Sequence, residues 1–273
     1  VPVNSPLDRP ESLAVSPDGH HLAIVGLHED DAYCVVVDAQ MTELYRWKMP
    51  NLAPASLDFS PDGRWLIAAP VSSELFLFDT ATGNVAWSHG TGRSDLWVRN
   101  QALFSRDGTY ILNGDGYGNL RVFDRASGEV VRELEVANGH VWPLALDHAG
   151  DRLFCGGNGA IDTWDWRTGE LLLSMHGHTG GVSALAMMPD DSRLISTGAD
   201  ATIRLWDAST GRQVMVVGRH DGPVGSVAVS HDGAVIATGG YDNSLRLWET
   251  REPSPAGLDA RYGRARRTWA PYR

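Results

Sequence analysis

Short runs of alternating apolar and polar residues fill most of this chain, and they predict β-strands rather than helices. The clearest runs are residues 193–197, 203–206 and 213–217, each bounded by turn-forming residues. A strand with one buried face has a period of two, because successive side chains point to opposite faces of a sheet. Long amphipathic segments are scarce, so the sequence predicts an all-β protein.

Two turns recur at a nearly constant spacing. A turn of the type Ser-Pro-Asp-Gly ends at residues 19, 63, 108, 150, 192 and 233, so its copies lie 41 to 45 residues apart. A second turn keeps the same spacing, and its clearest copies are Thr82-Gly83, Ser127-Gly128, Thr168-Gly169 and Thr210-Gly211. Glycine reaches positive φ without steric cost, which suits both turns to hairpins.

Each of the six units is expected to hold about four short strands. First strands are expected at 12–16, 56–60, 102–105, 143–147, 183–188 and 226–230. Fourth strands are expected at 43–49, 84–89, 129–136, 170–175 and 212–218. The sixth unit has no clear fourth strand, because Pro253 and Pro255 follow its third strand and lack the N–H groups that pair strands.

An apolar–acidic pair precedes each second turn, most clearly at Trp164-Asp165, Trp206-Asp207 and Trp248-Glu249. With its period of about 40–45 residues and four strands per unit, the sequence resembles the WD-repeat family of β-propellers from residue 11 to 250. The resemblance implies a β-propeller of four-stranded antiparallel blades. Its repeats lie near 11–50, 55–90, 101–139, 141–177, 182–219 and 224–250 of a domain spanning 1–250.

The family has a structural hydrogen-bond network that links a His, a Ser or Thr, an Asp and a Trp within one blade. The fifth repeat matches it with His178, Ser196, Asp200 and Trp206, and the sixth with His220, Thr238, Asp242 and Trp248. Because a buried Asp must be hydrogen-bonded, the resemblance implies that these residues lock the two blades.

The earlier repeats keep less of this network. The fourth has His140 and Trp164, with Cys155 and Asn158 in the places of Ser and Asp, and the third has Phe123 in place of Trp. The first two repeats keep none of the four. We therefore expect the N-terminal side to be less well locked.

Closure of the ring can be predicted in two ways. Val1–Asn4 could supply the missing strand and close a six-bladed ring. Alternatively, the six repeats belong to an incomplete seven-bladed propeller. The chain opens Val1-Pro2-Val3 without an initiator Met, which favours a piece of a longer protein.

Composition narrows the function. No apolar run among the 273 residues approaches the ~20 residues of a spanning helix, so no membrane association is expected. Lys48 is the only lysine beside 22 arginines, a bias of G/C-rich codons that favours a bacterial source. The net charge of −11 makes nucleic acid an unfavourable partner for the acidic body. We expect a cytoplasmic protein.

The sequence offers little evidence for a catalytic or metal-binding site. His176 and His178 form a pair that could bind zinc, but no third ligand adjoins them, and residues 115–119 resemble a calcium loop without its bidentate Glu. No G-x-S-x-G elbow is present. The first strands are apolar and contain one acid, Asp58. We therefore expect no enzyme, no metal and no cofactor.

The evidence for a surface that binds a partner is stronger than the evidence for a catalytic site. The loop at 90–101 is unusually long and contains Arg93, Trp97 and Arg99, a composition typical of interaction hot spots. Tyr117, Trp142 and Tyr241 are expected near the same loop face. Each of these aromatic residues either contacts a partner or packs between blades.

Residues 251–273 carry a net charge of +4 and are expected to form a basic, flexible tail, which nucleic acid or an acidic partner could bind. WD-repeat propellers are mostly interaction scaffolds. The resemblance thus implies a non-catalytic scaffold for a protein or peptide, within a larger bacterial signalling or regulatory protein. The alternative is a ligand-binding or hydrolytic propeller that uses its central channel.

Overall fold

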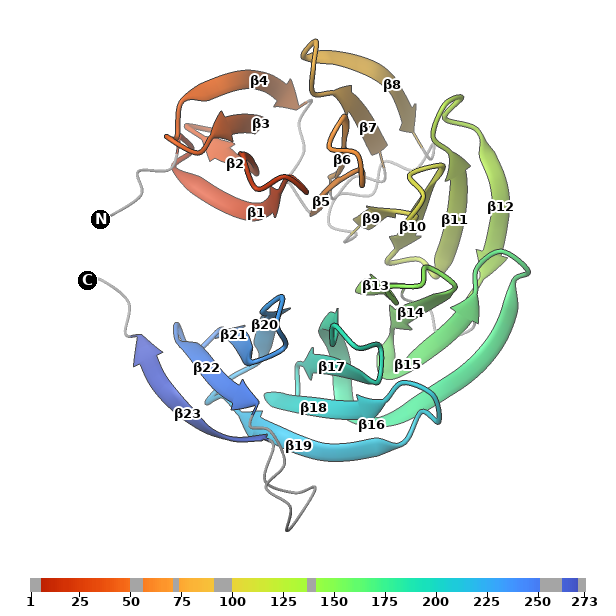
Figure 1. Ribbon diagram of the computed structural model, residues 1–273, viewed down its shortest axis with the longest axis vertical. Coiled ribbons are helices and arrows are strands. Elements are labelled where there is room, and N and C mark those ends of the chain that lie inside the picture. Colours follow the sequence, from red (N-terminus) through yellow and green to blue (C-terminus); the bar gives the residue numbers. More distant parts are fainter. Residues whose placement is uncertain are drawn as a thin grey trace. The chain divides into compact units, whose positions relative to one another are not determined.

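A computed structural model describes residues 6–49, 56–70, 74–90, 100–136 and 141–250, together with the backbone of 262–269. Every regular element in these ranges is a β-strand (Figure 1). Among the described residues, no helix has the length and hydropathy needed to cross a membrane. The fold is therefore all-β, as predicted.

The chain divides into two compact units, residues 1–141 and residues 142–273. Unit 1 holds three four-stranded antiparallel sheets in which each strand pairs with the next along the chain. The first sheet is formed by β1 (Arg9–Val15), β2 (His21–His28), β3 (Asp31–Asp38) and β4 (Glu43–Met49). The second is formed by β5 (Ser56–Phe59), β6 (Trp65–Ala69), β7 (Glu74–Asp79) and β8 (Asn84–Gly90). The third is formed by β9 (Asn100–Phe104), β10 (Tyr110–Asp115), β11 (Asn119–Asp124) and β12 (Val130–Glu135).

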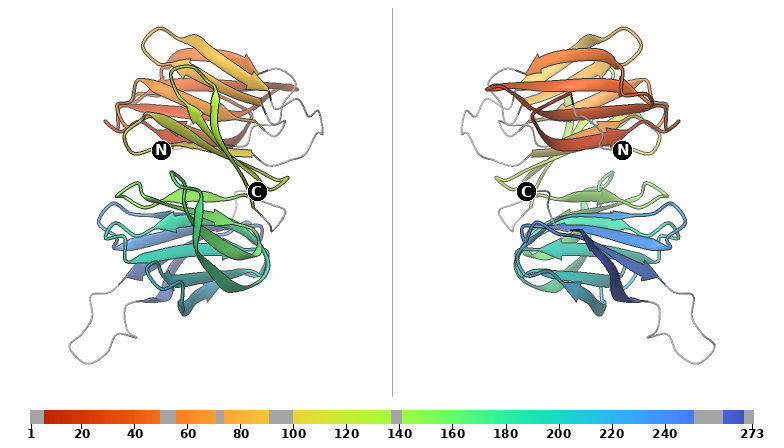
Figure 2. Two further views of the ribbon diagram at one scale, coloured as in Figure 1. Left: turned by 90° about the vertical axis from the view of Figure 1, so that its right-hand side faces the viewer. Right: turned by 90° about the vertical axis from the view of Figure 1, so that its left-hand side faces the viewer.

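Unit 2 continues the same plan with one difference. A seven-stranded sheet is formed by β13 (Leu144–Leu146), β14 (Arg152–Gly156), β15 (Asn158–Asp165), β16 (Glu170–Met187), β17 (Arg193–Gly198), β18 (Thr202–Asp207) and β19 (Gln213–Arg219). The last sheet is formed by β20 (Val224–Val229), β21 (Val235–Gly240), β22 (Leu245–Thr250) and β23 (Tyr262–Trp269). Figure 2 shows the sheets of each unit from the side. Four-stranded antiparallel sheets in this order are those of a β-propeller.

β16 joins two of the predicted strands, 170–175 and 183–188, into one strand of 18 residues. Its first half pairs with β15 and its second half with β17, with the change near Gly181 and Val182. The seven-stranded sheet is therefore two four-stranded sheets that share β16.

β23 differs from the flexible tail that the sequence predicted. Residues 262–269 pair antiparallel with β22, with Tyr262 opposite Thr250 and Trp269 opposite Leu245. The backbone of β22 would otherwise present unpaired N–H and C=O groups at the edge of the sheet. The prolines that argued against a fourth strand lie before this segment, not in it. Val1–Asn4, the alternative closing strand, lies outside the described residues.

The Ser-Pro-Asp-Gly turns owe their shape to side chains. In the first, Ser16 Oγ donates to Asp18 Oδ1 at 2.5 Å and accepts from the N–H of His21 at 2.9 Å. Gly19 then takes φ +71°, a conformation that residues with a Cβ rarely adopt. Equivalent bonds form at Ser60, Ser105 and Ser230.

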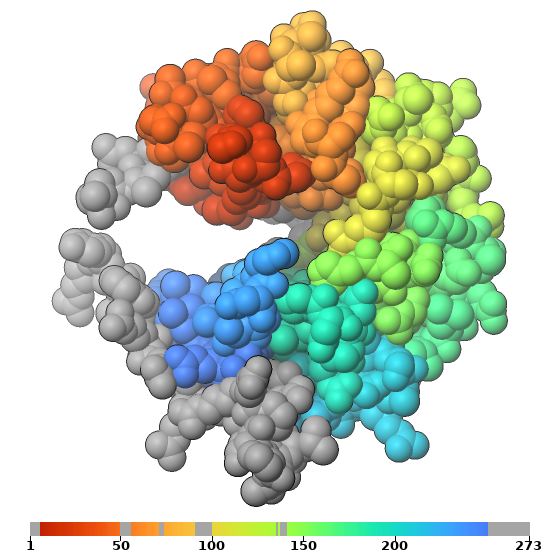
Figure 3. Space-filling model, viewed as in Figure 1, coloured from red at the N-terminus to blue at the C-terminus, as the bar shows by residue number. Residues whose placement is uncertain are grey.

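The core lies between adjacent sheets, which pack directly on each other within unit 1 (Figure 3). Leu57 and Phe59 of β5 pack on Val25 and Val36 of the first sheet. Ala102 and Phe104 of β9 pack in the same way on the second sheet.

Unit 1 has a lock that the sequence did not predict. Trp47 Nε1 of β4 donates to the carbonyl of Gly83 in the next sheet at 2.8 Å, and Trp87 Nε1 of β8 donates to the carbonyl of Arg125 at 2.8 Å. Each Trp contacts the second turn of the following sheet, where Gly83 and Gly128 have positive φ. The N-terminal sheets are thus latched to each other through their outer strands.

Candidate functional site

A chain of four buried side chains crosses the fifth repeat. His178 Nδ1 lies 3.0 Å from Asp200 Oδ1, and His178 Nε2 lies 2.7 Å from Ser196 Oγ. Trp206 Nε1 donates to Ser196 Oγ at 2.7 Å. His178 thus comes from β16, Asp200 from the turn before β18, and Ser196 and Trp206 from the paired strands β17 and β18; all four were named from the resemblance.

Protonation sets the direction of these bonds. Burial lowers the pKa of His178, so its imidazole is neutral at pH 7. Its Nδ1–H then donates to Asp200, and its Nε2 accepts from the Ser196 hydroxyl. Burial raises the pKa of Asp200, but hydrogen bonds from Thr202, Thr179 and His178 outweigh it and hold that pKa well below its usual range.

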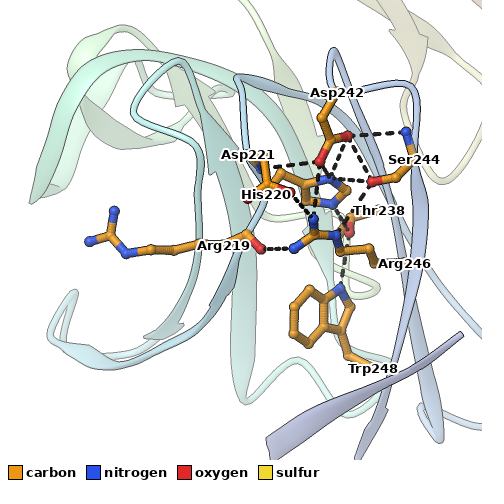
Figure 4. A network of polar contacts seen from close by, with 8 residues as sticks. All are labelled: Arg219, His220, Asp221, Thr238, Asp242, Ser244, Arg246 and Trp248. Carbon is orange, nitrogen blue, oxygen red and sulfur yellow. Dashed lines mark hydrogen bonds and ion pairs between the residues drawn. The ribbon is translucent and has the colours of Figure 1, made fainter. Parts of the chain in front are cut away.

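The sixth repeat has the same chain (Figure 4). His220 Nδ1 lies 3.0 Å from Asp242 Oδ1, and its Nε2 lies 2.8 Å from Thr238 Oγ1. Trp248 Nε1 donates to Thr238 Oγ1 at 2.9 Å. The two networks hold opposite ends of their blades together with buried polar groups that are all paired.

An arginine extends each network toward the surface. Arg246 Nη2 lies 3.2 Å from Asp242 Oδ2 and 2.9 Å from Asp221 Oδ2, and its Nη1 donates to the carbonyl of Arg219 (Figure 4). Arg204 pairs with Asp200 at 3.3 Å in the preceding repeat. The arginines therefore link buried aspartates to the loop ends of the sheets.

The third repeat holds a related network that the sequence analysis missed. Asp115 is buried and accepts hydrogen bonds from the N–H groups of Tyr117 and Asn119, and Arg121 pairs with it at 3.2 Å. Arg121 lies two residues before Phe123, just as Arg204 lies two residues before Trp206. This spacing could have revealed the network, although its Asp has moved along the chain.

The fourth repeat has no such chain among its described residues. Trp164 Nε1 is buried and has no hydrogen-bond partner there. Cys155 is buried, which raises the pKa of its thiol, whereas Asn158 is exposed. His140 lies outside the described residues.

Ser196, His178 and Asp200 have the connectivity of a hydrolytic triad. Ser196 is 0% exposed, however, and the Trp206 indole covers its oxygen with a hydrogen bond. A substrate carbonyl cannot approach this hydroxyl, so the arrangement is structural. No group of three or more His, Cys, Asp or Glu that could hold a metal occurs in the described part of the chain. His176 is exposed while His178 is buried, so the two do not converge.

The expected binding residues differ in exposure. Tyr241 is 64% exposed, whereas Tyr117 and Trp142 are half-buried. Arg93, Trp97 and Arg99 lie outside the described residues. Among Tyr117, Trp142 and Tyr241, Tyr241 is thus the most exposed residue.

Family models match two parts of the chain. Residues 169–207 and 211–249 match the WD domain, G-beta repeat. Residues 34–170 match the model described as outer membrane protein assembly factor BamB. The second match spans half of the chain, so the chain belongs to the family of that model. The assembly role in that description belongs to the protein BamB, after which the model is described.

Three animal proteins are similar to parts of the chain. The chain is 25% identical to WD repeat-containing protein SL1-17 of Schistosoma mansoni over 60% of this chain and 53% of the relative. It is 32% identical to Protein groucho of Drosophila melanogaster, over 39% of this chain and 15% of the relative. The Periodic tryptophan protein 2 homolog of Mus musculus is 23% identical over 36% and 11%.

The chain thus spans about half of the first relative and much less of the other two. Together with the two matched repeats, they support a WD-repeat family. All three are animal proteins, so they lend no support to the bacterial source expected from codon bias.

Proposed function

We propose that this protein is a non-catalytic scaffold that binds a protein or peptide partner at the loop ends of its sheets. The observation that carries this proposal is the Tyr241 ring, which is 64% exposed in a turn whose neighbours are held by the Asp242 network. An exposed aromatic side chain on a rigid base loses little conformational entropy on binding, which is typical of interaction hot spots.

The similarity to WD-repeat proteins supports the same proposal. The proposal also includes a signalling or regulatory role within a larger protein and a cytoplasmic location. Arg93, Trp97 and Arg99 are proposed to extend the surface, as are Tyr117 and Trp142 at the rims of their sheets. No observation favours the alternative, a channel enzyme, because the first strands of the described sheets are mostly apolar and hold two carboxylates, Glu11 in β1 and Asp58 in β5.

Site-specific photo-cross-linking tests the proposal. A cross-linking amino acid is placed at Tyr241 and, as a control, at Val131 on the outer strand β12, which is 55% exposed. We expect a discrete partner at position 241 and none at 131. The partner is then identified by mass, purified and rebound to the wild-type chain and to Tyr241→Ala.

Loss of binding in Tyr241→Ala, with unchanged thermal unfolding, supports the scaffold. Equal cross-linking at 241 and 131, or unchanged affinity of the purified partner for Tyr241→Ala, contradicts it.

A further inference from the structure

Strand β1 exposes two apolar side chains at positions that the next sheet buries. Leu13 and Val15 are 65% and 58% exposed, and they lie three residues and one residue before the Ser-Pro-Asp-Gly turn. In β5 the same two positions before the turn hold Leu57 and Phe59, which are buried. The repeat thus uses these two positions for its core, and the first sheet leaves them open to solvent.

The same kind of element covers this pair of positions wherever the pair is buried. The pair in β5 packs on the first sheet, and Ala102 and Phe104, the pair in β9, pack on the second sheet. Val227 and Val229, the pair in β20, pack on the sheet before theirs. Each pair is therefore covered by the far face of the preceding sheet. By the same rule, the surface that fits the β1 pair is the far face of another sheet of this repeat.

The last sheet of unit 2 has an open far face. Leu245 of β22 is 43% exposed and Leu247 is half-buried. The residues 42 positions earlier, Ile203 and Leu205 of β18, are fully buried and pack against the last sheet. Leu245 and Leu247 thus hold positions that, one sheet earlier, receive the apolar pair of a following sheet.

Small residues adjoin the two leucines on this face. Gly239 and Ala237 of β21 lie opposite Leu245 and Leu247 in the strand register, and residues opposite each other in antiparallel strands share one face. The equivalent face of the first sheet, which includes Ala23, is the one on which β5 packs. The open face of the last sheet is therefore apolar, and its small residues leave room for the side chains of an incoming strand.

We propose that a second copy of this chain docks head to tail, so that the open face of the first sheet in one copy packs on the open face of the last sheet in the other. The Leu13 face consists of Leu13, Val15 and Leu22, and the Leu245 face consists of Ala237, Gly239, Leu245 and Leu247. This contact goes beyond the proposed partner binding at Tyr241 and uses none of its residues.

Burial of apolar side chains drives this association. The two faces differ, so the contact is heterologous and leaves one face of each kind free for a further copy. The net charge of −11 on each copy opposes the contact, and salt weakens that repulsion. Association should therefore strengthen as sodium chloride rises, the reverse of what a contact between opposite charges would show.

Analytical ultracentrifugation of the full chain over a range of concentrations tests the inference. We expect the wild type to form dimers and larger species as its concentration rises. Leu13→Asp and Leu245→Asp should each weaken association about tenfold or more, because each places a charge in an apolar contact. Both positions are exposed, so circular dichroism should show an unchanged fold. Val15→Asp provides a second variant of the Leu13 face.

Val131→Asp is the matched control. Val131 lies on the outer strand β12 and is about as exposed as the two leucines, so its substitution adds the same charge away from both faces. We expect this variant to associate like the wild type. A loss as large as that of Leu13→Asp would show that only the total charge acts and would overturn the inference.

A mixture of the two face variants shows which faces meet. Leu245→Asp keeps the Leu13 face, and Leu13→Asp keeps the Leu245 face. Each variant alone should be monomeric, and their equimolar mixture should form a dimer that does not grow, because its two remaining faces are blocked. A wild type that is monomeric at every concentration would overturn the inference. Association of Leu245→Asp alone at the wild-type level would do so as well, because two Leu13 faces would then meet.

Discussion

At the scale of single residues, buried hydroxyls connect groups that would otherwise be unpaired. Ser196 accepts from the Trp206 indole and donates to His178, and Thr238 does the same between Trp248 and His220. Both hydroxyls are inaccessible to water. Their removal therefore leaves a buried imidazole nitrogen and a buried indole N–H without partners.

Ser196→Ala should lower the free energy of unfolding by about 1–3 kcal/mol, the cost of leaving buried polar groups unsatisfied. Urea denaturation of the whole chain measures the change. Thr238→Ser keeps the hydroxyl in the sister network and should cost clearly less. A Ser196→Ala variant as stable as the wild type would mean that water replaces the hydroxyl.

Asp58 should make stability depend on pH. Its Oδ2 accepts from the N–H of Phe104 at 2.8 Å, but burial outweighs this bond and raises its pKa to about 6, with Arg106 acting against the shift. A carboxyl with a raised pKa holds its proton more tightly when folded. Its contribution to stability is therefore full below about pH 4 and is lost as the pH rises through about 6.

Asp58→Asn retains an acceptor for the Phe104 N–H and cannot ionise. We expect this variant to unfold at a higher temperature than the wild type at pH 7.5, with the difference vanishing near pH 4. Thermal unfolding across this range measures the gap, and a gap that does not change with pH would contradict the assignment. Asp58→Ala, which lacks the acceptor, should be less stable than Asp58→Asn throughout.

At the scale of elements, the outer strands decide how neighbouring sheets are held. β4 and β8 each send a tryptophan to a turn of the following sheet, where its indole N–H donates to a backbone carbonyl. The glycine of the turn lies against an aromatic ring of the same outer strand, Tyr45 at Gly83 and Trp87 at Gly128. β23 completes the last sheet by pairing with β22. In both arrangements an outer strand forms hydrogen bonds with backbone groups of a neighbouring turn or strand.

Gly128→Ala tests the latch. Gly128 has φ +73°, and a Cβ there would lie 2.8 Å from Cδ2 of Trp87. Gly19→Ala is the matched control, because Gly19 has φ +71° and nothing within 4 Å of the added Cβ. In both variants the alanine at positive φ costs about 1–2 kcal/mol of stability. Gly128→Ala should lose further stability, because its Cβ also meets the Trp87 ring. Equal losses in urea denaturation would show that Trp87 yields without cost.

Removal of residues 251–273 tests β23. The truncated chain should unfold at a lower temperature and self-associate more than the full chain, because the outer edge of β22 is then unpaired. Thermal unfolding and light scattering measure the two effects. Removal of residues 270–273 alone keeps the strand and should change neither; a truncated chain that is equally stable and scatters no more light than the full chain would contradict the role of β23.

At the scale of the whole molecule, the negative charge shapes which partners approach. Many of the aspartates that contribute to the net charge of −11 also form the repeated turns, so part of this charge comes with the repeat. Charge of this size acts over several ångströms and is weakened by salt.

The repeat, the strands and the last two networks could be predicted from sequence because each depends on residues close along the chain. Hairpin turns need glycine and aspartate at set positions, and a blade network repeats every 42 residues from His178 to His220. The Asp115 network was missed because its carboxylate reaches Arg121 from a different position in the turn. The Trp47 and Trp87 latches were missed because their acceptors are backbone carbonyls, which carry no sequence signal.

The sequence by itself therefore determined the all-β class, the four-strand unit and the residues that fill each blade, because period and turn chemistry are local. Only the tertiary structure decided that 262–269 forms a strand, that β16 serves two sheets, and that Tyr241 is exposed. These features depend on which backbone edges and side chains remain uncovered once the sheets have packed, and packing joins residues far apart in the chain.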